Sequence, residues 1–133
     1  MITILDVLSV GPFYSNSFVR DVLLSRAKCR LIAATSVLDL YAIPASGKVD
    51  VAILHSALSS CELRSCAVYI RHHWPAAKIL LLHAQVEILD DPMYDERMLP
   101  DSSEESVLSM IERLAASSRR SERSSLSDWR NQH

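Results

Sequence analysis

The chain has 133 residues, of which 49% are hydrophobic, so it is long enough for one domain with a single ordinary core. Its formal net charge of -2 argues against a general polyanion binder, because phosphate backbones are bound mainly through an excess of Lys and Arg. No apolar run approaches the roughly 18 residues that a membrane-spanning helix needs. The N-terminus lacks the basic region of a signal peptide, and three cysteines cannot pair completely. We expect a soluble cytoplasmic protein.

The first third of the chain predicts two strands and two helices. Residues 2–10 are apolar and β-branched and end at Gly11, which predicts a buried strand. Residues 15–17 offer helix N-caps before an apolar helical stripe. A short strand over 30–34 and a weaker helix over 37–43 follow.

The middle of the chain contains the most apolar strand. Residues 49–55 form a short β-branched run that ends on His55, and this pattern is typical of a central strand buried on both faces. Ser59 and Glu62 have the spacing of a capping box at the start of the next helix. The following strand, residues 78–83, again ends on a histidine.

The last third predicts a short strand and a long helix. Residues 85–98 are acidic and broken by a proline, so we expect at most a short helix there and a short strand over 97–99. Ser102 and Glu105 have the spacing of another capping box. Strands and helices thus alternate five times, which predicts an α/β domain over residues 1–116 with a doubly wound parallel sheet and helices on both faces. Residues 117–133 are rich in Ser and Arg and are predicted to be a tail or linker, after a helical extension at most.

Three segments resemble a CheY-like response-regulator receiver domain, of the kind that precedes a LuxR-type (NarL/FixJ-like) DNA-binding domain. Residues 51–54 resemble the strand that carries the phosphoacceptor aspartate. Residues 69–82, Tyr-Ile-Arg-His-His-Trp-Pro-Ala-Ala-Lys-Ile-Leu-Leu-Leu, are similar to the junction between the third helix and the fourth strand. Residues 99–105 resemble the turn that opens the last helix. The resemblance implies five strands in the order 2-1-3-4-5, with the fourth helix shortened here, and a role in two-component signal transduction and transcription regulation.

The positions that carry the family's phosphorylation chemistry have all changed. An acidic pair, an aspartate, a Thr or Ser and a lysine are expected where this chain has Ser9 and Val10, His55, His83 and Leu99. Phosphoryl transfer to a carboxylate needs a cation held by oxygen ligands and fixed positive charge on the phosphoryl group. The sequence therefore predicts a degenerate pseudo-receiver, not an enzyme, that acts by protein contact or as a dimer.

Other interpretations remain open. His55 and His83 end adjacent predicted strands and could meet in a crevice that binds a small molecule or a borderline metal. A tetrahedral site needs more ligands, so we favour two histidines hydrogen-bonded to each other, to the backbone or to water in a filled pocket, and we expect no metal and no cofactor. A conventional phosphorelay receiver with an atypical phosphorylation site is a further alternative. An enzyme ranks last, because two glycines in the whole chain supply no phosphate-binding loop.

An acidic segment is the second feature that points to function. Residues 87–105 hold eight acids against one base, a local net charge of -7. In a receiver-like fold these residues lie on the face that the family uses for dimerisation and docking. We expect this face to bind a basic protein partner, and we expect no direct nucleic-acid binding by this segment. The acidic side chains that we predict to form the partner face are Glu87, Asp90, Asp91, Asp95, Glu96, Glu104 and Glu105.

Overall fold

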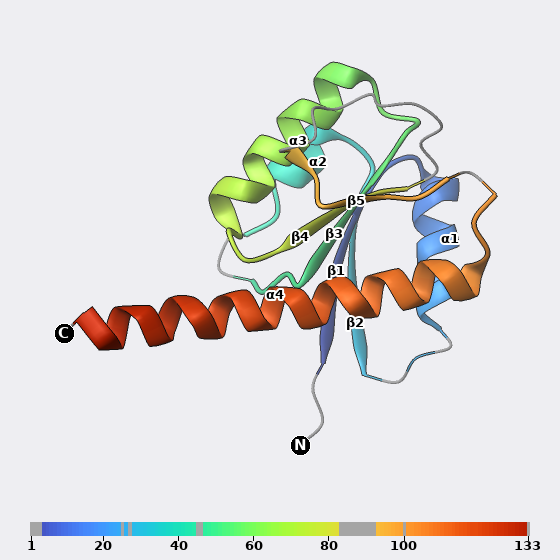
Figure 1. Ribbon diagram of the computed structural model, residues 1–133. Coiled ribbons are helices and arrows are strands. Elements are labelled where there is room, and N and C mark those ends of the chain that lie inside the picture. Colours follow the sequence, from blue (N-terminus) through green and yellow to red (C-terminus); the bar gives the residue numbers. More distant parts are fainter. Residues whose placement is uncertain are drawn as a thin grey trace.

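The centre of the fold is a five-stranded parallel sheet (Figure 1). The computed structural model describes residues 4–24, 26, 28–44, 47–82, 93–99 and 101–132, with side chains as far as residue 120. The strand order is β2-β1-β3-β4-β5, which confirms the predicted order. The strands are β1 (Leu5–Val10), β2 (Cys29–Ala34), β3 (Val51–His55), β4 (Lys78–Leu82) and β5 (Glu96–Arg97).

Helices cover both faces of the sheet, as predicted. The described helices are α1 (Phe13–Leu23), α2 (Val37–Tyr41), α3 (Ser60–His73) and α4 (Glu104–Gln132). α2 and α3 pack on one face, and α1 and α4 pack on the other (Figure 1). The shortened fourth helix of the prediction falls largely on residues 83–92, outside the described residues. Within the described part of the chain, no helix is long and apolar enough to cross a bilayer.

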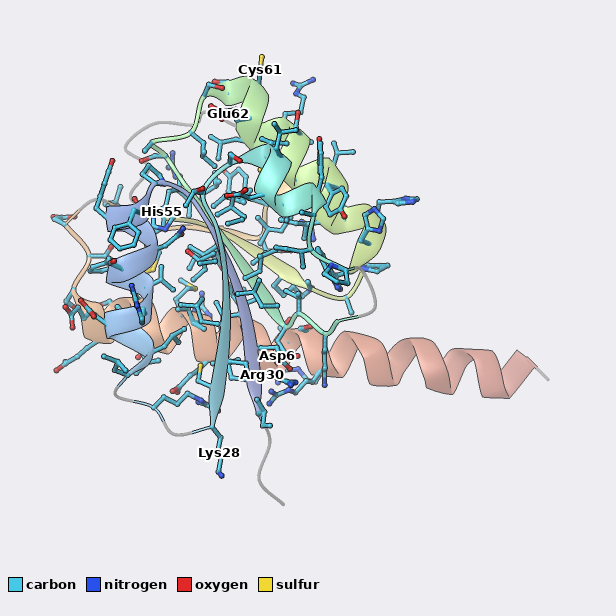
Figure 2. All side chains as sticks on the ribbon, turned by 180° about the vertical axis from the view of Figure 1, so that it is seen from behind. Asp6, Lys28, Arg30, His55, Cys61 and Glu62 are labelled. Atoms are coloured by element: carbon cyan, nitrogen blue, oxygen red, sulfur yellow. The ribbon has the colours of Figure 1, made fainter. Side chains whose placement is uncertain are left out.

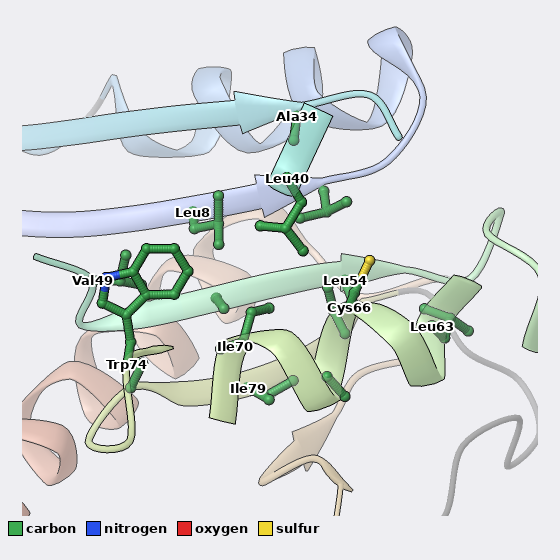
Figure 3. Packing of buried hydrophobic residues seen from close by; sticks show 14 of the residues in the cluster. Leu8, Ala34, Leu40, Val49, Leu54, Leu63, Cys66, Ile70, Trp74 and Ile79 are labelled. Atoms are coloured by element: carbon green, nitrogen blue, oxygen red, sulfur yellow. The ribbon is translucent and has the colours of Figure 1, made fainter. Parts of the chain in front are cut away.

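The pleat of the strands divides the core into two layers. Successive side chains of a strand point to opposite faces, so Leu8, Leu54 and Ile79 face α2 and α3 (Figure 3), whereas Val7 and Ile53 face α1 and α4. Because both faces are covered, these strands are apolar at nearly every position. This is why the continuous apolar runs of the sequence identified the strands correctly.

One predicted capping box is confirmed and one is wrong. At α3, the Glu62 N–H donates to Ser59 Oγ at 3.2 Å, and the Ser59 N–H donates to Glu62 Oε1 at 3.1 Å. At α4, Ser103 replaces Ser102 as the capping residue, and its Oγ accepts the Ser106 N–H at 3.2 Å. Ser102 lies in the turn before the helix, where its N–H donates to the Leu99 carbonyl at 3.2 Å.

The helix α4 continues past residue 116 without a break. Ser118 Oγ donates to the Ala76 carbonyl at 2.7 Å, and Arg119 Nη2 lies 3.3 Å from Asp50 Oδ2. The first residues of the predicted tail therefore pack on the domain as part of a helix. Beyond them α4 projects away from the sheet (Figure 1). A domain boundary at residue 116 stays a prediction.

Lys28 has a left-handed backbone conformation, with φ of 64°. Its carbonyl accepts the Leu5 N–H at 2.9 Å, which fixes the turn that leads into β2. Left-handed φ costs a residue with a Cβ roughly 1–2 kcal/mol, whereas glycine costs roughly 0.5–1 kcal/mol of chain entropy. We expect Lys28→Gly to raise the free energy of unfolding by about 0.5–1 kcal/mol in urea denaturation. Lys48→Gly, at an exposed site that lacks positive φ, is the control and should bring no gain.

Candidate functional site

The carboxyl ends of the strands form the edge at which ligand sites of open α/β sheets lie. β1 ends on Val10, β3 on His55 and β4 on Leu82, and the parallel register places Val10 beside Leu54 and His55 beside Leu82. Ser9, Val10 and His55 therefore lie at this edge of the sheet. His83 lies outside the described residues, so the proposed histidine pair stays a prediction.

Leu99 follows β5 and its side chain is 53% exposed. Its carbonyl accepts the Ser102 N–H at 3.2 Å, in the turn that leads into α4. This position, where the receiver resemblance implies a lysine, offers an exposed apolar side chain and no positive charge.

His55 is buried against the backbone of Gly11. Only 2% of His55 is exposed. A Cβ atom placed on Gly11 would lie 2.8 Å from His55 Cδ2 and 2.9 Å from both Cβ and Cγ of the same residue. The imidazole ring therefore occupies the space that any larger residue at position 11 would need. It lies on the sheet face of Ile53, the face that α1 and α4 cover.

Ser9 belongs to a buried hydrogen-bond network that joins two strands to α1. Its hydroxyl donates to Asn16 Oδ1 at 2.7 Å, and Asn16 Nδ2 donates to the carbonyls of Gly11 at 3.0 Å and of Ala34 at 3.1 Å. Asn16 thus ties the ends of β1 and β2 together. Within this network the Ser9 hydroxyl uses its proton in the hydrogen bond to Asn16.

Asn16 is the site residue that sequence analysis missed. The sequence predicted it as an N-cap, but α1 begins three residues earlier, at Phe13, and Asn16 is buried in its first turn. Pro12 is the capping residue, and its carbonyl accepts the N–H groups of Ser15 and Asn16. The Gly11–Pro12 pair was the available signal, because proline is favoured at the start of a helix.

The residues that end the five strands are Val10, Ala34, His55, Leu82 and Arg97, and none of them carries a carboxylate. Asp6 lies near the start of β1, at the opposite end of the strand from Val10, and pairs with Arg30 at 2.8 Å (Figure 2). Among the described residues, no group of three His, Cys, Asp or Glu side chains is placed to hold a metal ion.

The predicted acidic face is only partly assembled. Glu104 and Glu105 are exposed in the first turn of α4, and Glu96 pairs with Arg113 at 3.1 Å beside them. Asp95 does not join this group, because it accepts the Ile79 N–H at 2.8 Å and pairs with Arg71 of α3. Glu87, Asp90 and Asp91 lie outside the described residues.

A groove runs along α4 next to β5. Its volume is about 500 Å³, and Met98 and Met110 supply its apolar lining. Glu105 and Arg113 are the charged residues that line it, with the serines of α4 between them. The groove therefore combines adaptable apolar side chains with one acidic and one basic side chain.

The three cysteines are free thiols: Cys29, Cys61 and Cys66. Cys66 is packed in the core under α3, where burial raises the pKa of its thiol to about 11. Burial also raises the pKa of the half-buried Cys29 thiol. These two residues are packing side chains, whereas Cys61 is exposed.

No family model matches the sequence, and no curated protein is detectably similar to it. Solved structures do resemble the fold. The signal receiver domain of an HD domain-containing protein from Pseudomonas fluorescens Pf-5 has a TM-score of 0.74 at 15% identity, over 93% of this chain and 96% of that chain. A response regulator from Thermotoga maritima has a TM-score of 0.69 at 15% identity, over 86% of this chain and 99% of that chain.

The chemotaxis response regulator CheY4 of Vibrio cholerae is also similar, with a TM-score of 0.68 at 16% identity over 84% of this chain and 99% of that chain. Strand order, parallel pairing and the distribution of the helices agree with this likeness. The chain therefore has the fold of CheY-like response-regulator receiver domains.

Proposed function

We propose that the protein is a response-regulator-type signalling module that works without aspartyl phosphorylation and acts through protein contact. The observation that carries this proposal is the position of His55. It ends β3, where the receiver resemblance implies the phosphoacceptor aspartate, and its ring is packed against Gly11. An imidazole there offers no carboxylate to accept a phosphoryl group as an acyl phosphate.

The residues around His55 support the same conclusion. Ser9 is bound to Asn16, and the Val10 side chain is buried in the core. A hard cation such as Mg²⁺ takes oxygen ligands, chiefly carboxylates and water, and imidazole is a poor substitute. Among the described residues that end the strands, none supplies the nucleophile or the carboxylate ligands that phosphoryl transfer to an aspartate requires.

The groove along α4 is the contact surface that we assign to this function. Arg113 is already paired with Glu96, and Glu105 lines the groove with Glu104 next to it in the first turn of α4, so the remaining charge favours a basic protein segment. Met98 and Met110 would pack against an apolar side chain of that partner. Control of transcription, which the sequence resemblance implies, would then depend on the segment that α4 carries beyond the domain.

Incubation with acetyl phosphate and Mg²⁺ tests the proposal. We expect intact-mass spectrometry to show no phosphoryl adduct, whereas a receiver domain with the aspartate, treated in parallel, should show one. An adduct on this protein that hydroxylamine removes would be an acyl phosphate and would overturn the proposal. An acid-labile adduct that is lost in His55→Ala would instead establish the atypical phosphorelay receiver.

A further inference from the structure

Basic side chains gather at the amino ends of the strands. Lys28 leads into β2, and Lys78 opens β4. Arg119 reaches the same edge from α4, because its guanidinium donates to the Ile4 carbonyl just before β1. Figure 2 shows Lys28 at the end of the molecule opposite to His55. We call this surface the basic edge, and its cations are Lys28, Arg30, Lys48, Lys78, Arg119 and Arg120.

Part of the charge of the basic edge is available to a partner. Two buried acids lie at this edge, and they pair with two of its arginines: Asp6 with Arg30, and Asp50 with Arg119. Six cations against two acids leave a surplus of four positive charges. In the described part of the chain, no ion pair includes the cations that supply this surplus, which are Lys28, Lys48, Lys78 and Arg120.

An exposed apolar side chain lies in the middle of the basic edge. Ile4 precedes β1, the strand between β2 and β3, and is 40% exposed. Its carbonyl accepts from Arg119 at 3.1 Å, and the N–H of the next residue, Leu5, donates to the Lys28 carbonyl at 2.9 Å. These two bonds fix the backbone at Ile4. The basic edge thus presents an apolar side chain among lysines, which is the chemistry that the α4 groove favours in a partner.

The α4 groove and the basic edge of one copy are too far apart to meet. The groove includes residues of α4 from Glu105 to Arg113, whereas Arg119 of the same helix lies at the basic edge. Because α4 is one continuous helix with a rise of 1.5 Å per residue, Glu105 and Arg119 are about 21 Å apart along its axis. A contact between the two surfaces therefore needs a second copy of the chain.

We infer that the α4 groove of one copy binds the basic edge of a second copy. Ile4 of one copy packs against Met98 and Met110 of the next, and the lysines beside it face Glu104 and Glu105. Two different surfaces meet, so the contact is heterologous, and each copy binds one neighbour at the groove and another at the basic edge. This inference rests on the proposed function, because it names the basic partner of the groove.

Sedimentation velocity of the whole protein tests the inference. At about 0.01 M salt we expect the average mass to rise with protein concentration, because charges on the two surfaces attract each other over about 30 Å. At about 0.5 M salt this attraction is screened to a few ångströms, and we expect self-association to be at least about tenfold weaker.

Two charge-reversed variants locate the contact. Lys28→Glu with Lys48→Glu reverses the basic edge, and Glu104→Lys with Glu105→Lys reverses the acidic side of the groove, all at exposed positions. Each variant alone should associate at least about tenfold more weakly, because like charges then face each other. An equimolar mixture should regain association, because the groove of the first variant and the basic edge of the second are intact. Arg64→Glu, at an exposed position of α3, is the control and should associate like the unaltered protein. Thermal melting of each variant shows that the fold is kept.

Four outcomes would overturn the inference: a protein that stays monomeric, association that does not respond to salt, association that survives either reversal, or a mixture that does not associate. A lysine-rich peptide with one leucine then tests the groove alone. If it shifts the NMR signals of Met98 and Met110, the groove has another basic partner and the proposed function stands. A phosphoryl adduct would overturn the proposed function whatever the state of association, so the two failures are distinguishable.

Discussion

Gly11→Ala is expected to lower the free energy of unfolding by roughly 1–3 kcal/mol. The new methyl group would lie 2.8 Å from His55 Cδ2, and His55 is itself buried at the end of β3. Either the ring or the turn after β1 must move. The turn carries the Gly11 carbonyl that accepts from Asn16, so movement there also strains the Ser9 network. Urea denaturation of the two proteins measures the difference.

A double-mutant cycle separates this contact from any other effect of the substitution. In a His55→Ala background the methyl group has room, so Gly11→Ala should cost little there. Gly11 has no positive φ, which removes backbone strain as a competing cause. Gly47→Ala is the control at an open site, where the nearest atom is 3.6 Å away. Equal costs in both backgrounds would show that His55 does not pack on Gly11.

Asp50→Ala is expected to destabilise the protein by about 3 kcal/mol. The Asp50 carboxylate is 1% exposed, accepts the Asp6 N–H at 3.0 Å and pairs with Arg119 of α4 at 3.3 Å. Its removal leaves a buried N–H and a partly buried guanidinium without this acceptor. Chemical denaturation gives the loss, and Asp101→Ala, at an exposed position, should change stability little.

The same pair attaches α4 to the sheet, and this gives a second readout. Arg119 also donates to the Ile4 carbonyl at 3.1 Å, so it connects α4 to the residues that immediately precede β1 and β3. Arg119→Met should cost less than Asp50→Ala, because Arg119 is 26% exposed and water replaces part of its interactions. Both variants should speed amide hydrogen exchange in α4 around Ser118. If the rate of amide hydrogen exchange in α4 is unchanged in both variants, the Asp50–Arg119 pair does not attach α4 to the sheet.

The fold could be predicted from the sequence because its signals are local. Strands buried on both faces require continuous apolar runs, and the segments around Leu8, Ile53 and Leu80 have this pattern. The capping box at Ser59 and Glu62 is set by residues three apart and was identified for the same reason. The predicted start of α1 was wrong, because three adjacent polar residues suggested a cap, whereas Pro12 is the capping residue and the helix begins at Phe13.

The site was predicted only as a set of positions. Placing Ser9, Val10 and His55 at one edge needs no more than the ends of the strands. Their contacts depend on long-range geometry. Asn16 reaches Ala34 only because β2 lies beside β1, and His55 meets Gly11 only because Ser9 pairs with Ile53 in the register of β1 and β3. Neither the pairing register nor the rotation of α1 is encoded in a short sequence window.

Because α4 is one uninterrupted helix, it converts a rotation at the domain into a displacement some distance away. The last contacts described above are at Ser118 and Arg119, and the helix continues to Gln132. The twelve residues of α4 that follow Arg120 extend the helix by about 18 Å, at a rise of 1.5 Å per residue. A tilt of about 10° at the docked segment would therefore sweep the far end through about 3 Å. A displacement of that size is enough to break a hydrogen bond. A small tilt of the docked segment of α4 would therefore become a larger movement at the C-terminal end of the helix.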